Sequence, residues 1–163
     1  MMKKYKNGMY GGKFLPFHKG HMHCVEIAAS ECETLNLILF CGGAQEREVL
    51  KNDHREFLTL DSRIEHIRAA TSNMNNIRFF IIDVSGCFDS DGNELWDDET
   101  PLVISKTGEL DAVYASEPSY AEYFSRAYPN AEYRIIDTAR KEVPISATMV
   151  REMTEEEASK WIV

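Results

Sequence analysis

Short apolar runs alternate along this chain with longer segments whose apolar residues recur at helical spacing. The apolar runs are of strand length. They cover Gly8–Phe14, Leu35–Cys41, Ile77–Val84, Ala112–Ala115 and Glu132–Ile136. Strands that alternate with helices form parallel sheets covered on both faces. We therefore predict an α/β domain with a Rossmann-like, doubly wound, parallel five-stranded sheet and helices on both faces.

The predicted helices occupy the stretches between these strands. The first follows Gly20, and its apolar positions share a helical spacing: Met22, Val25, Ala29 and Cys32. The second covers Asp61–Ser72, with Asp61 or Ser62 as its cap. The others lie around Asp97–Ser105, about Ser119–Arg126 and from Ser146 onward. Because no repeat or low-complexity linker separates these elements, we expect one domain over residues 1–163.

The charge balance bears on the class of ligand. The net charge of −9 gives the chain no general attraction for a nucleic-acid backbone or an anionic membrane. Residues 1–25 are different, with five lysines, three histidines and no Asp or Glu. A basic segment in an acidic protein favours a small anionic ligand over a long polyanion.

The location of the protein follows from what its sequence lacks. No apolar run approaches the ~20 residues of a membrane span, and no apolar stretch follows the first lysines as in a signal peptide. The four cysteines form no Cys-x-x-Cys pair, and buried thiols are expected rather than disulfides: Cys24, Cys32, Cys41 and Cys87. We expect a cytoplasmic protein.

The segment after the first strand, residues 11–21, combines paired glycines, a proline and two histidines around Gly20 at the start of a predicted helix. A helix N-terminus offers unpaired N–H donors and a positive dipole, which suit phosphate. Imidazoles there add directed donors, and a glycine lets the backbone approach closely. This segment is the candidate phosphate site.

The sequence resembles a known superfamily at two places. His18-Lys19-Gly20-His21 resembles the His-x-Gly-His signature of nucleotidylyltransferases, and residues 145–151, Ile-Ser-Ala-Thr-Met-Val-Arg, resemble their Ile-Ser-x-Thr-x-x-Arg segment. Gly12-Lys13-Phe14-x-Pro16, Ser116-Glu117-Pro118 and residues 144–148 are similar to nicotinamide-mononucleotide adenylyltransferases. Among these, the likeness is strongest to the adenylyltransferase half of bifunctional bacterial NAD-biosynthesis regulators. It covers residues 8–161. The Walker-type loop of their kinase half does not occur here, so kinase and repressor activities are not carried over.

The resemblance implies the nucleotidylyltransferase fold and the transfer of AMP from ATP to nicotinamide mononucleotide, which yields NAD and pyrophosphate. It implies Mg²⁺ bound with ATP and no dedicated metal site in the protein. Members of the family form oligomers, which implies a homo-oligomer without fixing the number of subunits. Two alternatives stay open: another adenylyl- or cytidylyltransferase, such as the pantetheine-phosphate type, and a non-catalytic nucleotide-binding sensor.

The resemblance also implies roles for individual residues. Four would be catalytic: Lys13, His18, His21 and Arg151. The ATP phosphates would be bound by Gly20, Ser146, Thr148 and Arg151. The nucleotides would be held by Gly12, Phe14, Ser116 and Glu117. Residues 83–99, which hold seven acidic residues, would form a loop that closes over the nicotinamide. Trp96 in this loop would stack on the nicotinamide ring, since a cationic ring suits an aromatic face, and nearby carboxylates would also favour a pyridinium. Arg63 resembles a family position near the nucleotide.

Plainer interpretations compete with these roles. The histidines could be ordinary capping or surface residues, or could join His23 in a zinc site. Lys13 could be a solvated lysine, Arg151 a surface salt-bridge partner and Arg63 an exposed helix arginine. Trp96 could anchor its loop in the core, Ser146 could be a simple helix cap, and Ser116-Glu117-Pro118 a helix entry. In Asp89-Ser90-Asp91-Gly92 the glycine is at the fourth position rather than the sixth, so we expect no EF-hand calcium site.

Overall fold

The computed structural model describes residues 3–116, 120–136 and 143–162. Its strands are β1 (Tyr5–Gly12), β2 (Cys32–Cys41), β3 (Ile77–Asp83), β4 (Ala112–Ala115) and β5 (Glu132–Ile135). They form one parallel five-stranded sheet in the order β3-β2-β1-β4-β5. The order reverses between β1 and β4, as at the switch point of Rossmann-like sheets. The predicted fold class is confirmed.

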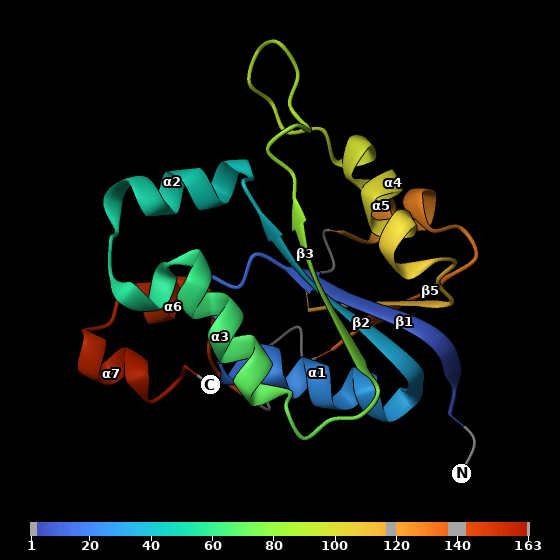
Figure 1. Ribbon diagram of the computed structural model, residues 1–163, viewed down its shortest axis with the longest axis horizontal. Helices are drawn as coiled ribbons and strands as arrows, with labels where there is room; N and C mark the ends of the chain where they lie inside the picture. The colour runs from blue at the N-terminus through green and yellow to red at the C-terminus, as the bar shows by residue number, and fades with distance from the viewer. Residues whose placement is uncertain (1–2, 117–119, 137–142, 163) are drawn as a thin grey trace.

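Helices cover both faces of the sheet (Figure 1). On one face lie α1 (Lys19–Glu31) and α3 (Leu60–Ala70), and on the other lie α4 (Trp96–Thr107) and α5 (Ala121–Ala127). Because successive strand residues point to opposite faces, Leu37 packs in the core of the first face and Ile38 in that of the second. Val25 of α1 and Val103 of α4 fill these two cores. The central strands β1, β2 and β4 are therefore buried on both sides, which explains the continuous apolar run of β2.

The other elements of the described residues are α2 (Ala44–Asn52), the 3₁₀ turn η1 (Glu56–Leu58), α6 (Ala147–Arg151) and α7 (Glu155–Ser159). The segment after α7 returns to the start of α1. There the N–H of Lys19 donates to the carbonyl of Trp161 over 2.8 Å, and His18 forms an antiparallel bridge with Ile162. The C-terminal signature segment is thus fixed beside the N-terminal one.

Several predicted boundaries were wrong. Cys32, predicted as the last apolar position of the first helix, is the first residue of β2. β1 ends at Gly12 because Phe14 has a φ of 50°, a left-handed conformation that no strand contains. Thr59, rather than Asp61 or Ser62, caps α3 by accepting the N–H of Ser62. Helix α2 and the turn η1 were not predicted at all. Ser119 lies outside the described residues, and α5 begins at Ala121.

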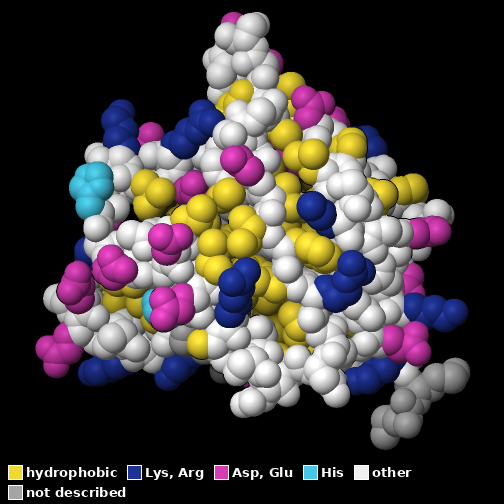
Figure 2. Space-filling view, in the orientation of Figure 1, with side chains coloured by type: hydrophobic (Ala, Val, Ile, Leu, Met, Phe, Trp, Pro, Cys, Tyr) yellow, Lys and Arg dark blue, Asp and Glu magenta, His cyan; other side chains and the backbone are white. Residues whose placement is uncertain are grey.

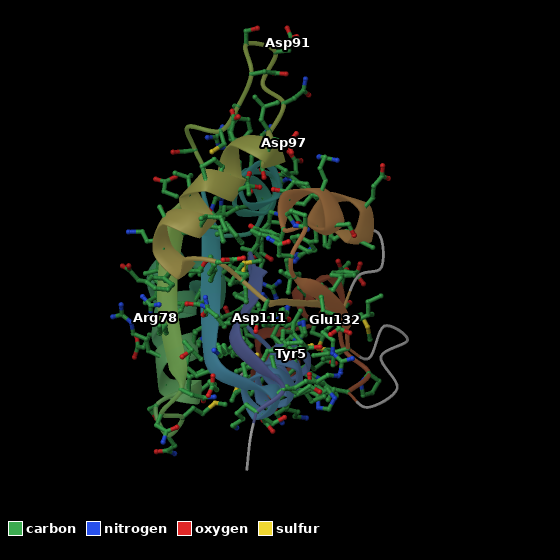
Figure 3. The ribbon with its side chains drawn as sticks, turned by 90° about the vertical axis from the view of Figure 1, so that its right-hand side faces the viewer. Tyr5, Arg78, Asp91, Asp97, Asp111 and Glu132 are labelled. Atoms are coloured by element: carbon green, nitrogen blue, oxygen red, sulfur yellow. The ribbon has the colours of Figure 1, made fainter. Side chains whose placement is uncertain are left out.

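The two ends of the sheet differ in character. At the amino ends of the strands, Tyr5 donates to Glu132, and Asp111 accepts the backbone N–H groups of Lys6 and Asn7 (Figure 3). Asp91 and Asp97 lie at the opposite end, in the loop after β3 and at the start of α4 (Figure 3). The amino end is closed by hydrogen bonds within the chain, and the carboxyl end is where a ligand would bind.

The edge strand β3 carries apolar side chains on the face shown in Figure 2, where hydrophobic groups gather between α3 and α4. Ile81 is 36% exposed there. The guanidinium of Arg68 lies 5.8 Å from the centre of the Phe79 ring, and that of Arg78 lies 5.0 Å from Phe80. Charged groups over an edge strand discourage edge-to-edge pairing.

All four cysteines are buried thiols, as the sequence predicts. Burial raises the pKa of three of their thiols, Cys32, Cys41 and Cys87. Within the described residues, no helix has the length and apolar character needed to cross a membrane.

Candidate active site

A cavity of about 280 Å³ opens at the carboxyl ends of β1 and β4. This is the switch point of the sheet, where ligands bind in open α/β domains. One end of the cavity is polar, and it brings together six predicted residues from the two signature segments: Lys13, His18, His21, Ser146, Thr148 and Arg151. The other end is aromatic. Two segments far apart in the sequence therefore meet in one place.

The two histidines are locked together by reciprocal hydrogen bonds. Nδ1 of His18 accepts the N–H groups of Gly20 and His21, at 3.0 and 3.3 Å, and Nδ1 of His21 accepts the N–H of His18 at 3.1 Å. Their rings stack with centroids 3.6 Å apart. Because each Nδ1 is an acceptor, the proton of each neutral imidazole is on Nε2. The pair presents two Nε2–H donors held in a fixed orientation.

His18 does cap α1, so the capping interpretation is correct for this residue. The surface interpretation is wrong, because His18 is 1% exposed and lines the cavity. In the zinc interpretation His23 would join the pair, but it does not line the cavity that His18 and His21 share. Among the described residues, no group of three or more His, Cys, Asp or Glu side chains could hold a metal ion.

Two glycines make room for the rings of this segment. A Cβ at Gly20 would lie 2.9 Å from Cε1 of His18 and 3.2 Å from Cγ2 of Ile145, so only glycine lets this turn close against both. A Cβ at Gly12 would lie 2.8 Å from the ring of Phe14. Phe14 in turn meets the His21 ring edge-to-face, with centroids 4.8 Å apart. Gly12 and Phe14 line the cavity, whereas Gly20 does not.

The second signature segment lines the same end. Ser146 caps α6 by accepting the N–H of Met149 at 3.2 Å, as the sequence predicts. Arg151 donates from Nη1 to the carbonyl of Leu15 (2.7 Å) and from Nη2 to Oγ1 of Thr148 (3.3 Å). Both partners of Arg151 are uncharged, so the interpretation of Arg151 as a surface salt-bridge partner is wrong. Burial lowers the pKa of the Arg151 guanidinium from its ordinary value.

Arg63 is not the exposed helix arginine of the plainer interpretation, because its side chain is fully buried. Its Nη1 donates to the carbonyl of Lys13 at 2.9 Å, its Nη2 to Oε2 of Glu46 at 2.9 Å, and its Nε to the carbonyl of Leu58 at 3.0 Å. The other oxygen of Glu46 accepts the N–H of Gly42 at 2.9 Å. Arg63 therefore holds the backbone of Lys13 from behind the cavity and does not line it.

The other end of the cavity is built around Trp96. Its ring lies 5.2 Å from that of Tyr120 and 5.3 Å from that of Tyr123, and the Tyr123 hydroxyl donates to the Trp96 carbonyl. Trp96 is 36% exposed, so the core interpretation is wrong: the indole is a wall of the cavity rather than a buried anchor. An aromatic wall of this kind suits a planar, cationic ring.

Two carboxyl groups stand beside this aromatic wall. Glu94 and Glu99 both line the cavity. Burial and the neighbouring Glu94 raise the pKa of Glu99 to about 8. Both residues lie within residues 83–99, a segment that holds seven acidic residues and was expected to lie over the nicotinamide. The tertiary position of that loop, rather than any local pattern, brings these two of its carboxyls into the cavity.

Of the residues predicted to hold nucleotide, Ser116 follows β4 and lines the cavity. Glu117 lies outside the described residues. The sequence did not single out Gln45, Phe40, Tyr120 or Tyr123, which also line the cavity. Tyr120 and Tyr123 stand at the start of α5, and their spacing of three residues puts them on one helical face; that spacing was the available signal.

The sheet order and a cavity at its switch point define the class of the protein as a Rossmann-like α/β domain with a ligand site at the carboxyl ends of its strands. A model of the family described as cytidylyltransferase-like matches residues 9–153, and the chain belongs to that family.

Sequence relatives of this chain have a more specific name than the family. The chain is 28% identical over 120 residues to a nicotinamide-nucleotide adenylyltransferase of Halorubrum lacusprofundi, covering 74% of this chain and 61% of the relative. It is 30% identical over 122 residues to the enzyme of the same name from Methanocorpusculum labreanum, covering 75% and 65%. The chain thus spans less than two thirds of the length of these relatives.

A solved structure supports the fold. A NadR protein crystallised with NAD and AMP-PNP matches with a TM-score of 0.65 and 24% identity, covering 99% of this chain and 46% of that one.

Proposed function

We propose that this protein transfers AMP from ATP to nicotinamide mononucleotide, giving NAD and pyrophosphate. One observation carries the proposal: both nucleotidylyltransferase signatures line the polar end of a single cavity whose other end is aromatic and acidic. A phosphate-binding end and an end suited to a pyridinium ring are what this reaction needs. The named activity of the relatives supports the same assignment.

In the proposed reaction, a phosphate oxygen of the mononucleotide attacks the α-phosphorus of ATP. A new P–O bond forms while the bond to the departing pyrophosphate breaks. Because the nucleophile is already an anion, the protein needs no nucleophile of its own and no strong base. Catalysis then depends on alignment and on stabilising charge at the phosphorus and on the leaving group.

The described residues can supply that stabilisation. His18 and His21 line the cavity end that would hold the triphosphate, and their mutual hydrogen bonds fix the two rings that would offer it Nε2–H donors. Arg151 adds a partly buried positive charge beside the hydroxyl of Thr148. Lys13, which lines the same cavity, would add an ammonium group. Donors that are fixed before the substrate binds cost no reorganisation when charge develops.

Mg²⁺ would enter with ATP, since it is usually held by phosphate oxygens and water. The donors at the polar end are imidazole, guanidinium, ammonium and hydroxyl groups. This set fits an ion carried by the triphosphate rather than one caged by carboxylates. Bound there, Mg²⁺ would neutralise phosphate charge. Four buried thiols suit a reducing compartment, and we propose that the reaction takes place in the cytoplasm.

The test is NAD formation from ATP, Mg²⁺ and nicotinamide mononucleotide, with phosphopantetheine as a competing acceptor. NAD and equimolar pyrophosphate are expected. AMP transfer to phosphopantetheine alone would move the protein to the pantetheine-phosphate type. Tight ATP binding without transfer to either acceptor would favour the sensor.

A further inference from the structure

The two carboxyl groups at the aromatic end differ in how they are held. Oε1 of Glu94 accepts the N–H of Ala44, the first residue of α2, at 2.8 Å. The backbone of Gly43 passes so close that a Cβ there would lie 2.7 Å from the same oxygen. Burial opposes ionisation of Glu94, but its partners, Trp96 among them, outweigh burial and lower the pKa of its carboxyl. Glu94 is therefore a carboxylate held by the N–H of Ala44, and it connects the loop after β3 to α2.

Glu99 is one turn further along, on the first turns of α4, and it meets Glu94 side chain to side chain. Its Oε2 is buried and receives a hydrogen bond from no donor in the described part of the chain. A buried acceptor without a donor is costly. Because this carboxyl lines the cavity, a donor group of the ligand can supply the hydrogen bond that Oε2 of Glu99 lacks within the chain.

We propose that the pair Glu94–Glu99 is the specificity-determining element of the acceptor end, where it selects a pyridinium mononucleotide that carries an uncharged carboxamide over one that carries a carboxylate. This inference rests on the proposed function, and it assigns to that function a substrate preference and the residues that set it.

The carboxamide and carboxylate substituents of the two mononucleotides would interact differently with Glu94 and Glu99. A carboxamide has an NH₂ group that can donate to the buried oxygen of Glu99, whereas a carboxylate has only acceptors. A carboxylate would also add a negative charge beside two acidic groups, and like charges in a partly desolvated site cost several-fold to many-fold in affinity. The pyridinium ring is cationic in both substrates and favours neither.

The protonation of the pair adds a dependence on pH. The titratable groups that influence or face Glu99 come from three segments and are Lys13, Cys87, Glu94, Tyr123 and Tyr128. Burial and Glu94 raise the pKa of Glu99 to about 8, so the pair shares one proton and one negative charge near pH 7. The pKa values of Cys87, Tyr123 and Tyr128 are also raised, which keeps those groups neutral in this range. Above pH 8 the pair carries two negative charges and repels a carboxylate more strongly.

The test compares kcat/KM for nicotinamide mononucleotide with that for nicotinic acid mononucleotide from pH 6.5 to 9, with ATP and Mg²⁺ held constant. The phosphate ionisation is common to both substrates and cancels in the ratio. We expect the ratio to favour the amide at least about tenfold near pH 7 and to rise about threefold or more across pH 8. This profile uses the unaltered protein, so it does not depend on the folding of any variant.

Glu99→Gln then assigns the effect to the pair. An amide at position 99 removes the titrating charge and can donate to a carboxylate, so the ratio should fall about tenfold or more and lose its rise with pH. Asp98→Asn is the matched control. It removes one acidic charge from the neighbouring residue, which is exposed and does not line the cavity, and it should leave the ratio as it is.

Three results would overturn the inference: a ratio near or below one, a ratio that neither pH nor Glu99→Gln changes, or an equal change with Asp98→Asn. Calorimetric Kd values of the two mononucleotides give the same comparison without turnover. Failure to form any dinucleotide would therefore refute the proposed function, while the binding preference would still decide the role of the pair.

Discussion

Arg63 and Glu46 form an ion pair with 2.9 Å between Nη2 and Oε2, in which the guanidinium is fully buried and every hydrogen-bonding nitrogen has a partner. The pair joins the loop after β1, through the carbonyl of Lys13, to the loop after β2, through the N–H of Gly42. Both loops lie at the carboxyl end of the sheet. The Arg63–Glu46 pair thus links the two loops that lie next to the cavity.

Arg63→Met should destabilise the protein by about 3–5 kcal/mol, because it leaves the carboxylate of Glu46 buried without its cation and two carbonyls without a donor. The free energy of unfolding in urea measures this loss. Arg68→Met, on the exposed side of the same helix, is the control and should cost less than about 1 kcal/mol. Equal losses of unfolding free energy in the two variants would contradict a stabilising role for the Arg63–Glu46 pair. The double variant Arg63→Met, Glu46→Met should recover part of the stability.

His21→Ala should lower kcat by about 10²–10³-fold while the Kd for ATP rises far less, because a donor aimed at developing charge contributes mainly in the transition state. Steady-state turnover and ATP binding by calorimetry separate the two quantities. His54→Ala replaces an exposed histidine between α2 and η1 and should leave both unchanged. Turnover near that of the unaltered protein would remove His21 from the mechanism.

Trp96→Ala should raise KM for the mononucleotide and leave KM for ATP unaltered, because the indole forms a wall of the aromatic end only. The sequence contains two tryptophans, so fluorescence can locate the stacking. Quenching by the mononucleotide should persist in Trp161→Phe and disappear in Trp96→Phe. An equal rise in both KM values would instead indicate a general loss of structure.

At the amino end of the sheet, Glu31 accepts hydrogen bonds from the Tyr114 hydroxyl (2.7 Å) and the Arg134 guanidinium (3.1 Å). Burial opposes ionisation of Glu31, but these two partners outweigh it and lower the pKa of its carboxyl. A lowered pKa in the folded state contributes stability above the unfolded value of about 4.5, and this stability is lost as pH falls through the folded value.

Urea unfolding between pH 7 and pH 3 should therefore show a smaller acid-induced loss in Glu31→Gln than in the unaltered protein. Glu33→Gln changes an exposed glutamate two residues away and should follow the unaltered protein. Parallel curves for Glu31→Gln and the unaltered protein would show that the network does not act as its geometry indicates.

The sequence predicted those parts of the fold that carry an apolar signal. The sheet and four of its covering helices follow from apolar period, and β4 was predicted with its observed bounds. Helix α2 was missed because its one buried residue is Glu46, which leaves no apolar stripe to detect. Cys32 was assigned to a helix because its spacing from Ala29 fits a helical period, although its burial belongs to the strand that follows.

The candidate site likewise has one end that the sequence predicted and one end that it mostly did not. Two short signatures predicted the polar end, since their chemistry is local to each segment. The aromatic and acidic end depends on the placement of the loop after β3 against α2 and α5, which no local pattern encodes. Trp96 was therefore singled out alone, without Tyr120 and Tyr123. The acidic residues of 83–99 were expected as a group to favour a pyridinium ring, but no local pattern distinguished Glu94 and Glu99 among them.

The hydrogen bond from Arg151 to the Leu15 carbonyl has a consequence for synthesis on the ribosome. Translation at about 5–20 residues per second separates the emergence of the first signature from that of the second by on the order of ten seconds. During that interval the nascent chain has its histidines but no guanidinium to complete the polar end. A growing chain is thus expected to bind triphosphate poorly, and nucleotide would stabilise the protein only after residue 151 has left the exit tunnel.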